Sequence, residues 1–179
     1  AGMSFDFRIE DSPVLDGVKI ITPDVFEESR GTIWTSFLDD QIGALLPKGL
    51  RFKHDKFSLS HNNVLRGLHG DHKSWKLVTC VYGEVHQVVA DMREGSPTYL
   101  KFQRIVINRQ NQKLVLIPPG MGNAYYVSSP EAVYHYKLAY EGDYIDADQQ
   151  FTVAWNDPRL NIDWPTDDPI LSARDARLA

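Results

Sequence analysis

Five residues that carry or can accept a positive charge lie close together in a sequence that otherwise reads as strands. They are Arg66, His69, His72, Lys73 and Lys76, and apolar runs precede and follow them. A histidine suits proton transfer because its ordinary pKa lies near neutral pH. An arginine suits an anion because its donors form a fork that matches phosphate. The cluster therefore predicts a site in which His69 is a general base and Arg66 holds an anion.

The spacing of Arg66 and His69 decides whether both side chains can face one site. Successive side chains of a regular strand point to opposite faces, so residues three apart lie on opposite faces. Gly67 lies between them, and a glycine permits a bulge that changes the direction of a neighbouring side chain. The predicted site therefore requires a bulge at Gly67. The alternatives are that Arg66 is a solvent-facing charge and that His69 is a structural histidine.

Three histidines, His61, His69 and His72, leave a metal site open as a second interpretation, because imidazole binds zinc, iron, nickel and copper. The β-barrel proteins known as cupins often add a histidine after a Pro-x-Gly bend. Here the bend occupies residues 118–120, and the residue three positions after it is Asn123. An amide is a poor ligand for a transition metal, so the sequence favours a site without metal.

A second group of candidate residues lies in the run 134–140. Tyr134, Tyr136 and Tyr140 alternate along it and so share one face of a strand. A tyrosine that faces a barrel interior can donate a proton, and its ring can stack on a sugar or a base. For Tyr134 a structural place in the core is the stronger alternative. Asp175 near the C-terminus is a carboxylate that could orient a histidine, with a helix-surface charge as its alternative.

Length and composition bound the class of protein. The chain has 179 residues, one domain by size, with 42% hydrophobic and 24% charged residues, as in ordinary globular proteins. A net charge of −5 argues against nucleic acid, and no apolar run is long enough to span a membrane. The single cysteine, Cys80, lies in an apolar strand, which indicates a buried thiol and a reducing, cytoplasmic setting. Ala1 and Gly2 precede Met3 and are interpreted as a remnant of cloning.

The elements that must position these residues are mostly short strands. Turn residues recur about every eight to twelve positions, which is typical of an all-β sandwich or barrel. Gly83 and Glu84 predict a tight turn that joins 75–82 and 85–92 as a hairpin. The expected strands span residues 18–21, 32–38, 52–60, 65–68, 75–82, 85–92, 99–107, 113–117, 124–127 and 132–140, and short helices are expected at 39–46, capped by Asp39 or Asp40, and at 172–178.

The ordered motifs of the chain resemble those of the dTDP-4-dehydrorhamnose 3,5-epimerase family, a group of metal-independent cupins. The resemblance covers nearly all of residues 15–175. It implies an all-β cupin-type jelly-roll barrel with short peripheral helices, a homodimer, and no cofactor. The motifs that carry it are Ser-Arg-Gly (29–31), Val-Leu-Arg-Gly-Leu-His (64–69), Lys-Leu-Val (76–78), Gly-Glu-Val (83–85), Gly-Ser-Pro-Thr (95–98), Ile-Pro-Pro-Gly (117–120), Tyr-Lys (136–137), Trp-Asn-Asp-Pro (155–158), Ile-Asp-Trp-Pro (162–165) and Pro-Ile-Leu-Ser-x-x-Asp (169–175).

The resemblance also implies a role for each matching residue. His69 matches the catalytic base, and Asp175 matches the carboxylate paired with it. Tyr136 matches the proton donor on the opposite side of the sugar, and Lys76 matches a lysine near the C4 oxygen. Arg30 and Arg66 match contacts to the nucleotide diphosphate. The complete set of expected substrate-binding residues is Arg30, Arg66, His54, Lys56, Asn123 and Tyr140.

Such residues can invert a carbon next to a ketone. A C4 keto group acidifies the hydrogens on C3 and C5, and a base that removes one leaves an enolate, whose oxygen a cation stabilises. An acid on the opposite face then returns a proton; a tyrosine serves where nearby cations lower its pKa. The resemblance implies an isomerase that inverts C3, with C5 as a second candidate centre, of a nucleotide-linked 4-keto-6-deoxy sugar in bacterial O-antigen or capsule synthesis. The alternatives are a nucleotide-sugar 3,4-ketoisomerase and a cupin that binds a sugar nucleotide without turnover.

The chain departs from the family's common pattern near the site. Asn123 stands where histidine is usual, Gly70 and Asp71 stand where Tyr-Gln is common, and residues 54–56 read His-Asp-Lys where Gln-Asp-Asn is common. These differences leave dTDP, GDP and CDP open as the nucleotide. They indicate the branch of the family that acts on GDP-linked heptoses and CDP-hexoses.

Overall fold

This computed structural model describes residues 7–179, so the interpretation of Ala1 and Gly2 lies outside the described residues. Nearly all of its regular structure is β-strand, with three short helical turns in the same residues. The elements are β1 (Phe7–Asp11), β2 (Lys19–Pro23), β3 (Val25–Glu28), β4 (Gly31–Trp34), η1 (Gly43–Leu45), β5 (Phe52–His61), β6 (Leu65–Gly70), β7 (Trp75–Tyr82), β8 (Val85–Asp91), β9 (Phe102–Ile107), β10 (Leu114–Ile117), β11 (Met121–Val127), β12 (Glu131–Ala139), η2 (Ala147–Gln149), β13 (Phe151–Thr152) and α1 (Ala173–Ala176).

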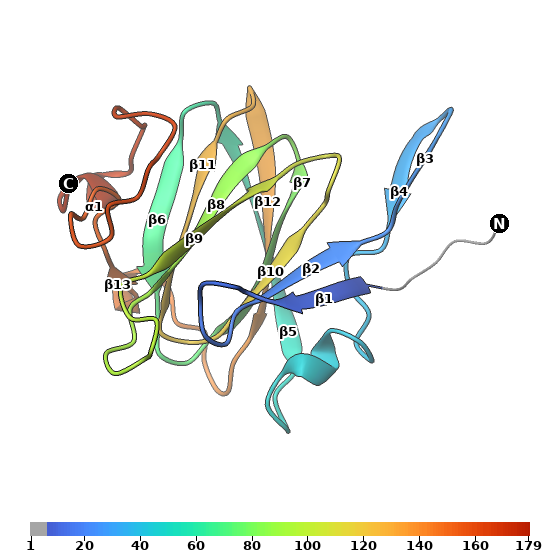
Figure 1. Ribbon diagram of the computed structural model, residues 1–179, viewed down its shortest axis with the longest axis horizontal. Coiled ribbons are helices and arrows are strands. Elements are labelled where there is room, and N and C mark those ends of the chain that lie inside the picture. The colour runs from blue at the N-terminus through green and yellow to red at the C-terminus, as the bar shows by residue number, and fades with distance from the viewer. Residues whose placement is uncertain (1–6) are drawn as a thin grey trace.

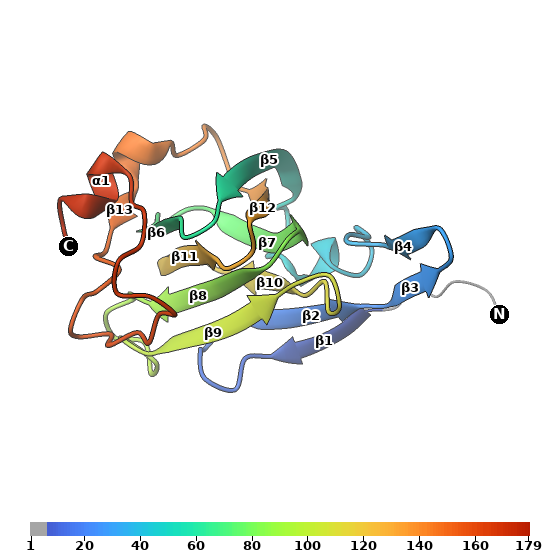
Figure 2. The same ribbon diagram turned by 90° about the horizontal axis from the view of Figure 1, so that it is seen from above.

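Two antiparallel sheets form the body of the molecule (Figure 1). The larger sheet has the strand order β1-β2-β10-β7-β12-β5, and the smaller sheet has the order β13-β6-β11-β8-β9. β3 and β4 pair only with each other, and both views show their hairpin projecting away from the sheets (Figure 2). The expected all-β cupin-type barrel with short helical turns is confirmed.

The expected hairpin between β7 and β8 is wrong. β7 pairs with β10 and β12 in the larger sheet, whereas β8 pairs with β11 and β9 in the smaller one. The turn at Gly83 therefore carries the chain from one sheet to the other. Gly83 has a φ of +86°, and a Cβ at this position would lie 2.2 Å from the carbonyl oxygen of Glu131. The close approach of β12 thus requires a glycine at this crossing.

The remaining differences lie mainly in the first fifty residues. A hairpin of two short strands, β3 and β4, replaces the single strand expected over 32–38, and β1 and β13 were not expected. The helix expected at 39–46 is only the turn η1, because Gly43 disfavours a helix and Pro47 ends the segment. At the other end, α1 confirms the expected helical turn, and its Ser172 Oγ accepts the Asp175 N–H at 3.2 Å.

The core lies between the sheets and continues on both outer sides. Cys80 is fully buried in the central cluster, as expected, and burial raises the pKa of its thiol to about 11. A second cluster joins η1 and the start of β5 to the larger sheet. A third covers the outer side of the smaller sheet, where Val153 and Leu160 pack on Leu68 and Val88. The C-terminal segment is therefore a structural layer of the barrel.

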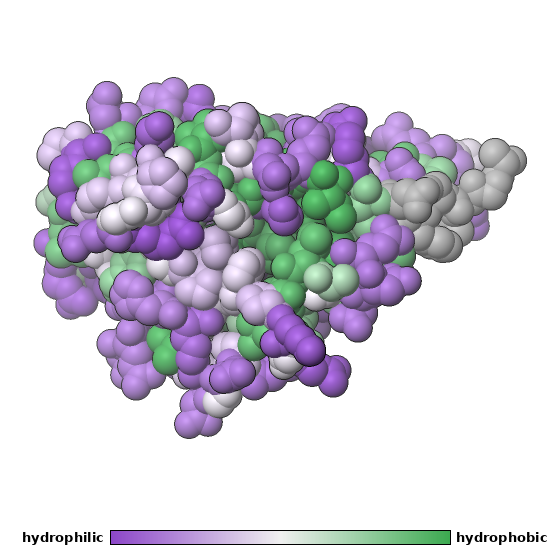
Figure 3. Space-filling view, turned by 60° about the horizontal axis from the view of Figure 1, so that its bottom comes forward, coloured by the Kyte–Doolittle hydropathy of each residue, from purple (hydrophilic) through white to green (hydrophobic). Residues whose placement is uncertain are grey.

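The surface of the molecule is mixed in character. Hydrophobic residues reach it in a band between more hydrophilic areas (Figure 3). Among residues 7–179, no helix has the length and the apolar character needed to cross a membrane.

Candidate active site

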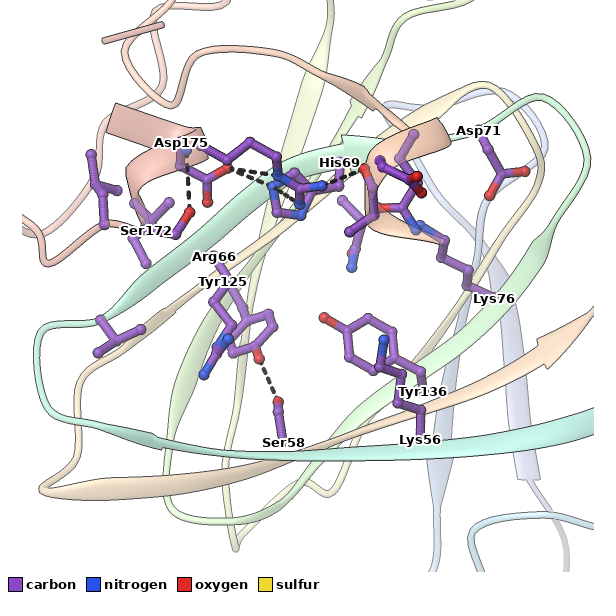
Figure 4. Close-up of a pocket in the computed structure, with 18 of the residues that line it drawn as sticks. Lys56, Ser58, Arg66, His69, Asp71, Lys76, Tyr125, Tyr136, Ser172 and Asp175 are labelled. Atoms are coloured by element: carbon purple, nitrogen blue, oxygen red, sulfur yellow. Dashed lines mark hydrogen bonds and ion pairs between the residues drawn. The ribbon is translucent and has the colours of Figure 1, made fainter. Parts of the chain in front are cut away.

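A cavity of about 800 Å³ lies between β5, β7 and β12 of the larger sheet and β6 and β11 of the smaller sheet (Figure 4). The C-terminal segment forms another part of its wall, through residues 170–177. Three strands of one sheet and two of the other thus direct side chains into one space. The predicted site residues that line it are His69, Tyr136, Asp175, Lys76, Arg66, Lys56 and Asn123.

The bulge that the sequence required at Gly67 is present. Asn123 of β11 pairs with His69, and Tyr125 pairs with Arg66, so two steps along β11 match three along β6. Gly67 has a φ of +130°, and a Cβ there would lie 2.5 Å from the Asn123 carbonyl oxygen. The extra residue turns Arg66 and His69 toward the same cavity.

His69 and Asp175 form a pair at the cavity wall. His69 Nε2 lies 2.6 Å from Asp175 Oδ1, and the Gly67 N–H donates to Oδ2 at 3.2 Å. Burial opposes the charge of Asp175, but the hydrogen bond and charge of His69 and the Gly67 N–H outweigh it. They hold the pKa of this carboxyl below its ordinary value. An ionised Asp175 accepts the Nε2 proton, which leaves Nδ1 of His69 as the nitrogen that can take up a proton.

Arg174 is a neighbour of this pair that the sequence did not single out. Its Nη2 lies 2.7 Å from His69 Nε2, and its Nη1 donates to the Ala147 carbonyl oxygen at 2.6 Å. Nε2 cannot both donate to Asp175 and accept from Arg174, and the ionised carboxylate favours the donating tautomer. The motif that led to Asp175 leaves position 174 open, so the only sequence signal was its place beside Asp175.

Tyr136 faces the cavity from the side opposite His69 (Figure 4). Burial raises the pKa of Tyr136 well above its ordinary value, and Tyr125 and Tyr134 act in the same direction. The charge of Arg66 lowers it by less. The expected lowering by a nearby cation is thus present at Arg66, but burial outweighs it. The phenol keeps its proton near neutral pH, which is the form that a proton donor needs.

Lys76 is the buried cation of the site, with 7% of its surface exposed. Burial lowers its pKa to about 8, with Lys56 acting in the same direction and Asp71 opposing both. Lys76 is therefore mostly charged at neutral pH. The more exposed Lys56 and Arg66 extend the positive charge along the cavity, where Arg66 Nε donates to Ser60 Oγ at 2.9 Å. This arrangement fits an anionic ligand in a chain whose net charge is −5.

Three predicted substrate-binding residues lie outside this cavity. Arg30 is at the turn between β3 and β4, with 88% of its side chain exposed and its Nε 2.9 Å from Glu28. His54 Nδ1 and the Tyr140 hydroxyl bond to each other at 3.0 Å. They lie next to the cavity, because His54 pairs with Leu138 and its ring lies 4.8 Å from that of Tyr144, and both of these neighbours line the cavity. The sequence reasoning missed Tyr144 because it lies in the acidic segment after the last long strand.

The histidines of the metal interpretation have separate partners. His61 Nδ1 is 3.8 Å from a Glu131 carboxylate oxygen, and His72 packs against Phe151 with 5.4 Å between ring centroids. Across residues 7–179, no three or more histidine, cysteine, aspartate or glutamate residues gather in a metal-binding arrangement.

Comparisons with known proteins agree with this geometry. A family model described as dTDP-4-dehydrorhamnose 3,5-epimerase matches residues 13–179. The dTDP-4-dehydrorhamnose 3,5-epimerase of Escherichia coli K12 is 34% identical over 168 residues, which cover 92% of this chain and 89% of that relative.

Solved structures give the same result. The dTDP-6-deoxy-D-glucose-3,5-epimerase of Legionella pneumophila in complex with dTDP-4-keto-L-rhamnose has a TM-score of 0.86 and 35% identity, over 97% of this chain and 92% of that one. A 4-keto-6-deoxy sugar epimerase from the novobiocin gene cluster of Streptomyces spheroides has a TM-score of 0.87 and 32% identity, over 99% and 90%. As its motifs predicted, the chain belongs to the dTDP-4-dehydrorhamnose 3,5-epimerase family of isomerases.

Proposed function

We propose that this protein inverts C3, with C5 as a second centre, of a dTDP-linked 4-keto-6-deoxy sugar. The single observation that carries the proposal is the placement of the His69–Asp175 pair and Tyr136 on opposite sides of one cavity. The dTDP nucleotide is supported by the relatives, one of which holds dTDP-4-keto-L-rhamnose. The proposed setting is sugar-nucleotide synthesis for a bacterial O-antigen or capsule, in the cytoplasm.

The proposed reaction uses a base and an acid on opposite faces of the sugar ring. His69 takes a proton from the carbon next to the C4 ketone, and Asp175 stabilises the imidazolium that forms. Lys76 stabilises the charge that develops on the C4 oxygen. Tyr136 then gives its proton to the carbon from the other face, which inverts the centre. Proton exchange with solvent restores both side chains, and the balance needs no electron acceptor or donor.

A position-resolved deuterium experiment tests this function. The protein is incubated in D₂O with dTDP-4-keto-6-deoxyglucose, and NMR follows the label at C3 and C5. We expect deuterium at C3 with inversion, and His69→Asn should abolish it. A carbonyl that moves to C3 would instead indicate a 3,4-ketoisomerase, and tight binding without exchange a binding protein. Exchange only with a GDP- or CDP-linked sugar would assign the protein to the other branch.

We also propose that the protein is a homodimer, in which Arg30 serves the cavity of the partner subunit. Three large apolar side chains are exposed on the larger sheet: Phe57 by 61%, Leu59 by 57% and Tyr82 by 66%. Leu59 and Tyr82 both pair with Val133, so they share one face with it. Such a patch is typical of a protein interface. Arg30 lies outside the cavity of its own subunit, which leaves it available to the cavity of a partner subunit.

Sedimentation measures this assembly directly. We expect wild-type protein to sediment as a dimer and Leu59→Asp to shift it toward monomer. Arg30→Ala should leave the dimer intact and raise the KM for the sugar nucleotide. A wild-type monomer with full activity would contradict the proposal.

A further inference from the structure

Behind the cavity wall lies a chain of three buried polar side chains that the proposed reaction does not use. They are Tyr134 and Gln87, which are fully buried, and Asn123, which is 4% exposed. The Tyr134 hydroxyl donates to Gln87 Oε1, and Gln87 Nε2 donates to Asn123 Oδ1 at 2.5 Å. Asn123 is the member of this chain that lines the cavity. The network thus connects the protein interior to the site through one amide.

A backbone carbonyl fixes the direction of these hydrogen bonds. Gln87 Nε2 also donates to the Val88 carbonyl oxygen at 3.2 Å. A carbonyl oxygen only accepts, so the nitrogen of the Gln87 amide must lie on this side. The same nitrogen donates to Asn123, so the oxygen of Asn123 must face Gln87. Reversing the Gln87 amide would place acceptors together, and reversing the Asn123 amide would place two donors together; folded proteins avoid both in a buried site.

Tyr134 completes this arrangement at the inner end. Burial raises the pKa of Tyr134 well above its ordinary value, in spite of hydrogen bonding with Asn123 and Gln87. The hydroxyl therefore keeps its proton and can donate it to Gln87 Oε1. With both atoms of the Gln87 amide engaged, Asn123 has its oxygen occupied. Its Nδ2 carries two hydrogens, so a bond to Tyr134 still leaves one hydrogen to donate elsewhere.

The amide of Asn123 stands beside the proposed base. Asn123 pairs with His69 across β11 and β6, and Lys76 lines the same cavity. Asn123 and His69 thus direct neighbouring side chains into one cavity, which puts an amide donor beside the proposed base. The family usually carries a histidine here, whereas an amide donates without titrating between acid and neutral pH.

We propose that Gln87 is a positioning residue that turns the Nδ2 of Asn123 toward the cavity, where it donates to the C4 oxygen of the substrate. The inference rests on the proposed function. When His69 takes the proton, the C–H electron pair forms a double bond to C4, and the carbonyl pair moves to the C4 oxygen. Asn123 stabilises this enolate together with Lys76.

Asn123→Asp tests the donor with almost no change of shape. The variant keeps an oxygen toward Gln87 and places a second oxygen where the Nδ2 donor was. We expect kcat for exchange at C3 to fall by about 10²–10³-fold, the effect of losing one donor to a developing oxyanion. KM should change by less than about threefold, because the interaction acts mainly in the transition state. Wild-type kcat in this variant would overturn the proposal.

Gln87→Glu tests the positioning role through a pH profile. The introduced carboxyl can donate to Asn123 only while it is protonated; once ionised it accepts from Asn123 and reverses the amide. The ratio of variant to wild-type kcat should therefore fall as pH rises. Thr79→Val is the matched control, since Thr79 is buried and donates to the Lys113 carbonyl oxygen at 2.8 Å, outside the cavity. Its ratio should stay constant. A constant ratio for Gln87→Glu, over a pH range in which infrared spectroscopy shows that the introduced carboxyl ionises, would overturn the positioning role.

Neutron diffraction on deuterium-exchanged crystals of the free protein separates this inference from the proposed function. We expect deuterons on the Asn123 atom that faces the cavity and none on the atom that faces Gln87. The reverse placement would overturn the inference whatever the activity. An absence of exchange in the wild-type protein would instead overturn the proposed function.

Discussion

In the proposed reaction, Tyr136 donates the proton that inverts the carbon after His69 has removed one from the other face. Its raised pKa keeps the phenol protonated, and Tyr136→Phe removes only the hydroxyl. We expect solvent deuterium to enter C3 with retention, because His69 can return a deuteron to the face from which it took the proton. Formation of the inverted product should fall at least about a hundredfold. NMR of label and configuration measures both.

Tyr126→Phe is the matched control for this change. The Tyr126 hydroxyl donates to Asn63 Oδ1 at 2.9 Å, and Tyr126 does not line the cavity. This variant should exchange and invert as the wild type does. Normal inversion by Tyr136→Phe would remove the tyrosine from its proposed role.

Asp91 shows that a family motif can be structural. The fully buried carboxylate accepts from Ser96 Oγ and Thr98 Oγ1, each at 2.6 Å, and from Arg93 Nε at 3.0 Å. Two of these donors belong to the Gly-Ser-Pro-Thr motif, which therefore closes a loop and does not contact the cavity. Burial raises the pKa of Asp91, but the donors together lower it to about 2.

The lowered pKa of Asp91 gives a pH-dependent stability. Because the folded-state pKa lies below the ordinary 3.8, the stabilisation is complete above that value and is lost as pH falls through about 2. Asp91→Asn should therefore lower the free energy of unfolding at pH 7 by about 2–3 kcal/mol and flatten its dependence between pH 4 and 2. Urea denaturation measures both effects. Asp11→Asn, at an 82% exposed carboxylate, should change little, and an equal loss there would contradict the assignment.

At the scale of the element, the bulge in β6 decides whether the site exists. Gly67→Ala would add a Cβ 2.5 Å from the Asn123 carbonyl oxygen at a φ of +130°. We expect the free energy of unfolding to fall by about 2 kcal/mol or more. Exchange at C3 should also fall, because His69 and Arg66 can no longer face the same cavity. Thermal unfolding and the deuterium assay measure the two effects.

Gly95→Ala separates the steric effect from the backbone effect. Gly95 has a φ of +86°, and a Cβ there would meet nothing within 4 Å. This variant should lose about 1–2 kcal/mol from the left-handed backbone alone and keep full exchange. An equal loss of exchange in both variants would show that the bulge has no special role.

The bulge and the crossing turn show what sequence patterns can predict about elements. Alternation and turn residues locate strands, and the chemistry at Arg66 and His69 forced the prediction of a bulge. The same patterns failed at Gly83, because a tight turn reads alike whether its strands pair or separate into two sheets. Strand pairing depends on long-range packing, which a local pattern does not contain.

The site residues divide in a similar way. Tyr136 could be predicted because strand parity and the family motif agree. His69 could be predicted only because the motif was preferred to parity, which required the bulge at Gly67. Arg30 was assigned from its motif alone, and it lies on a hairpin whose direction no local pattern gives. Arg174 was missed because the chemistry of a position between two motif residues depends on where a four-residue helix docks.

For the molecule as a whole, the C-terminal segment joins stability to chemistry. It covers the smaller sheet through Val153 and Leu160, and Trp164 Nε1 donates to the Trp155 carbonyl oxygen at 2.8 Å. Ile170 then pairs with the chain at the start of β6, through bonds of 2.8 and 3.0 Å, and the segment ends at α1 near β6 (Figure 1). Residues of α1 line the cavity. The two tryptophan-containing motifs, residues 155–158 and 162–165, thus lie in the C-terminal segment that positions Asp175 beside His69.

Removing residues 170–179 should separate the two roles of the C-terminal segment, which are to cover the smaller sheet and to position Asp175. The apolar residues that cover the smaller sheet precede this stretch, so we expect the midpoint of thermal unfolding to fall by only a few degrees. Exchange at C3 should fall at least about a hundredfold, because His69 loses the carboxylate that fixes its tautomer. A shorter deletion of 178–179 leaves Asp175 in place and should retain exchange. If the longer deletion keeps wild-type exchange, Asp175 has no part in proton transfer; if it unfolds the protein, the last turn is part of the core.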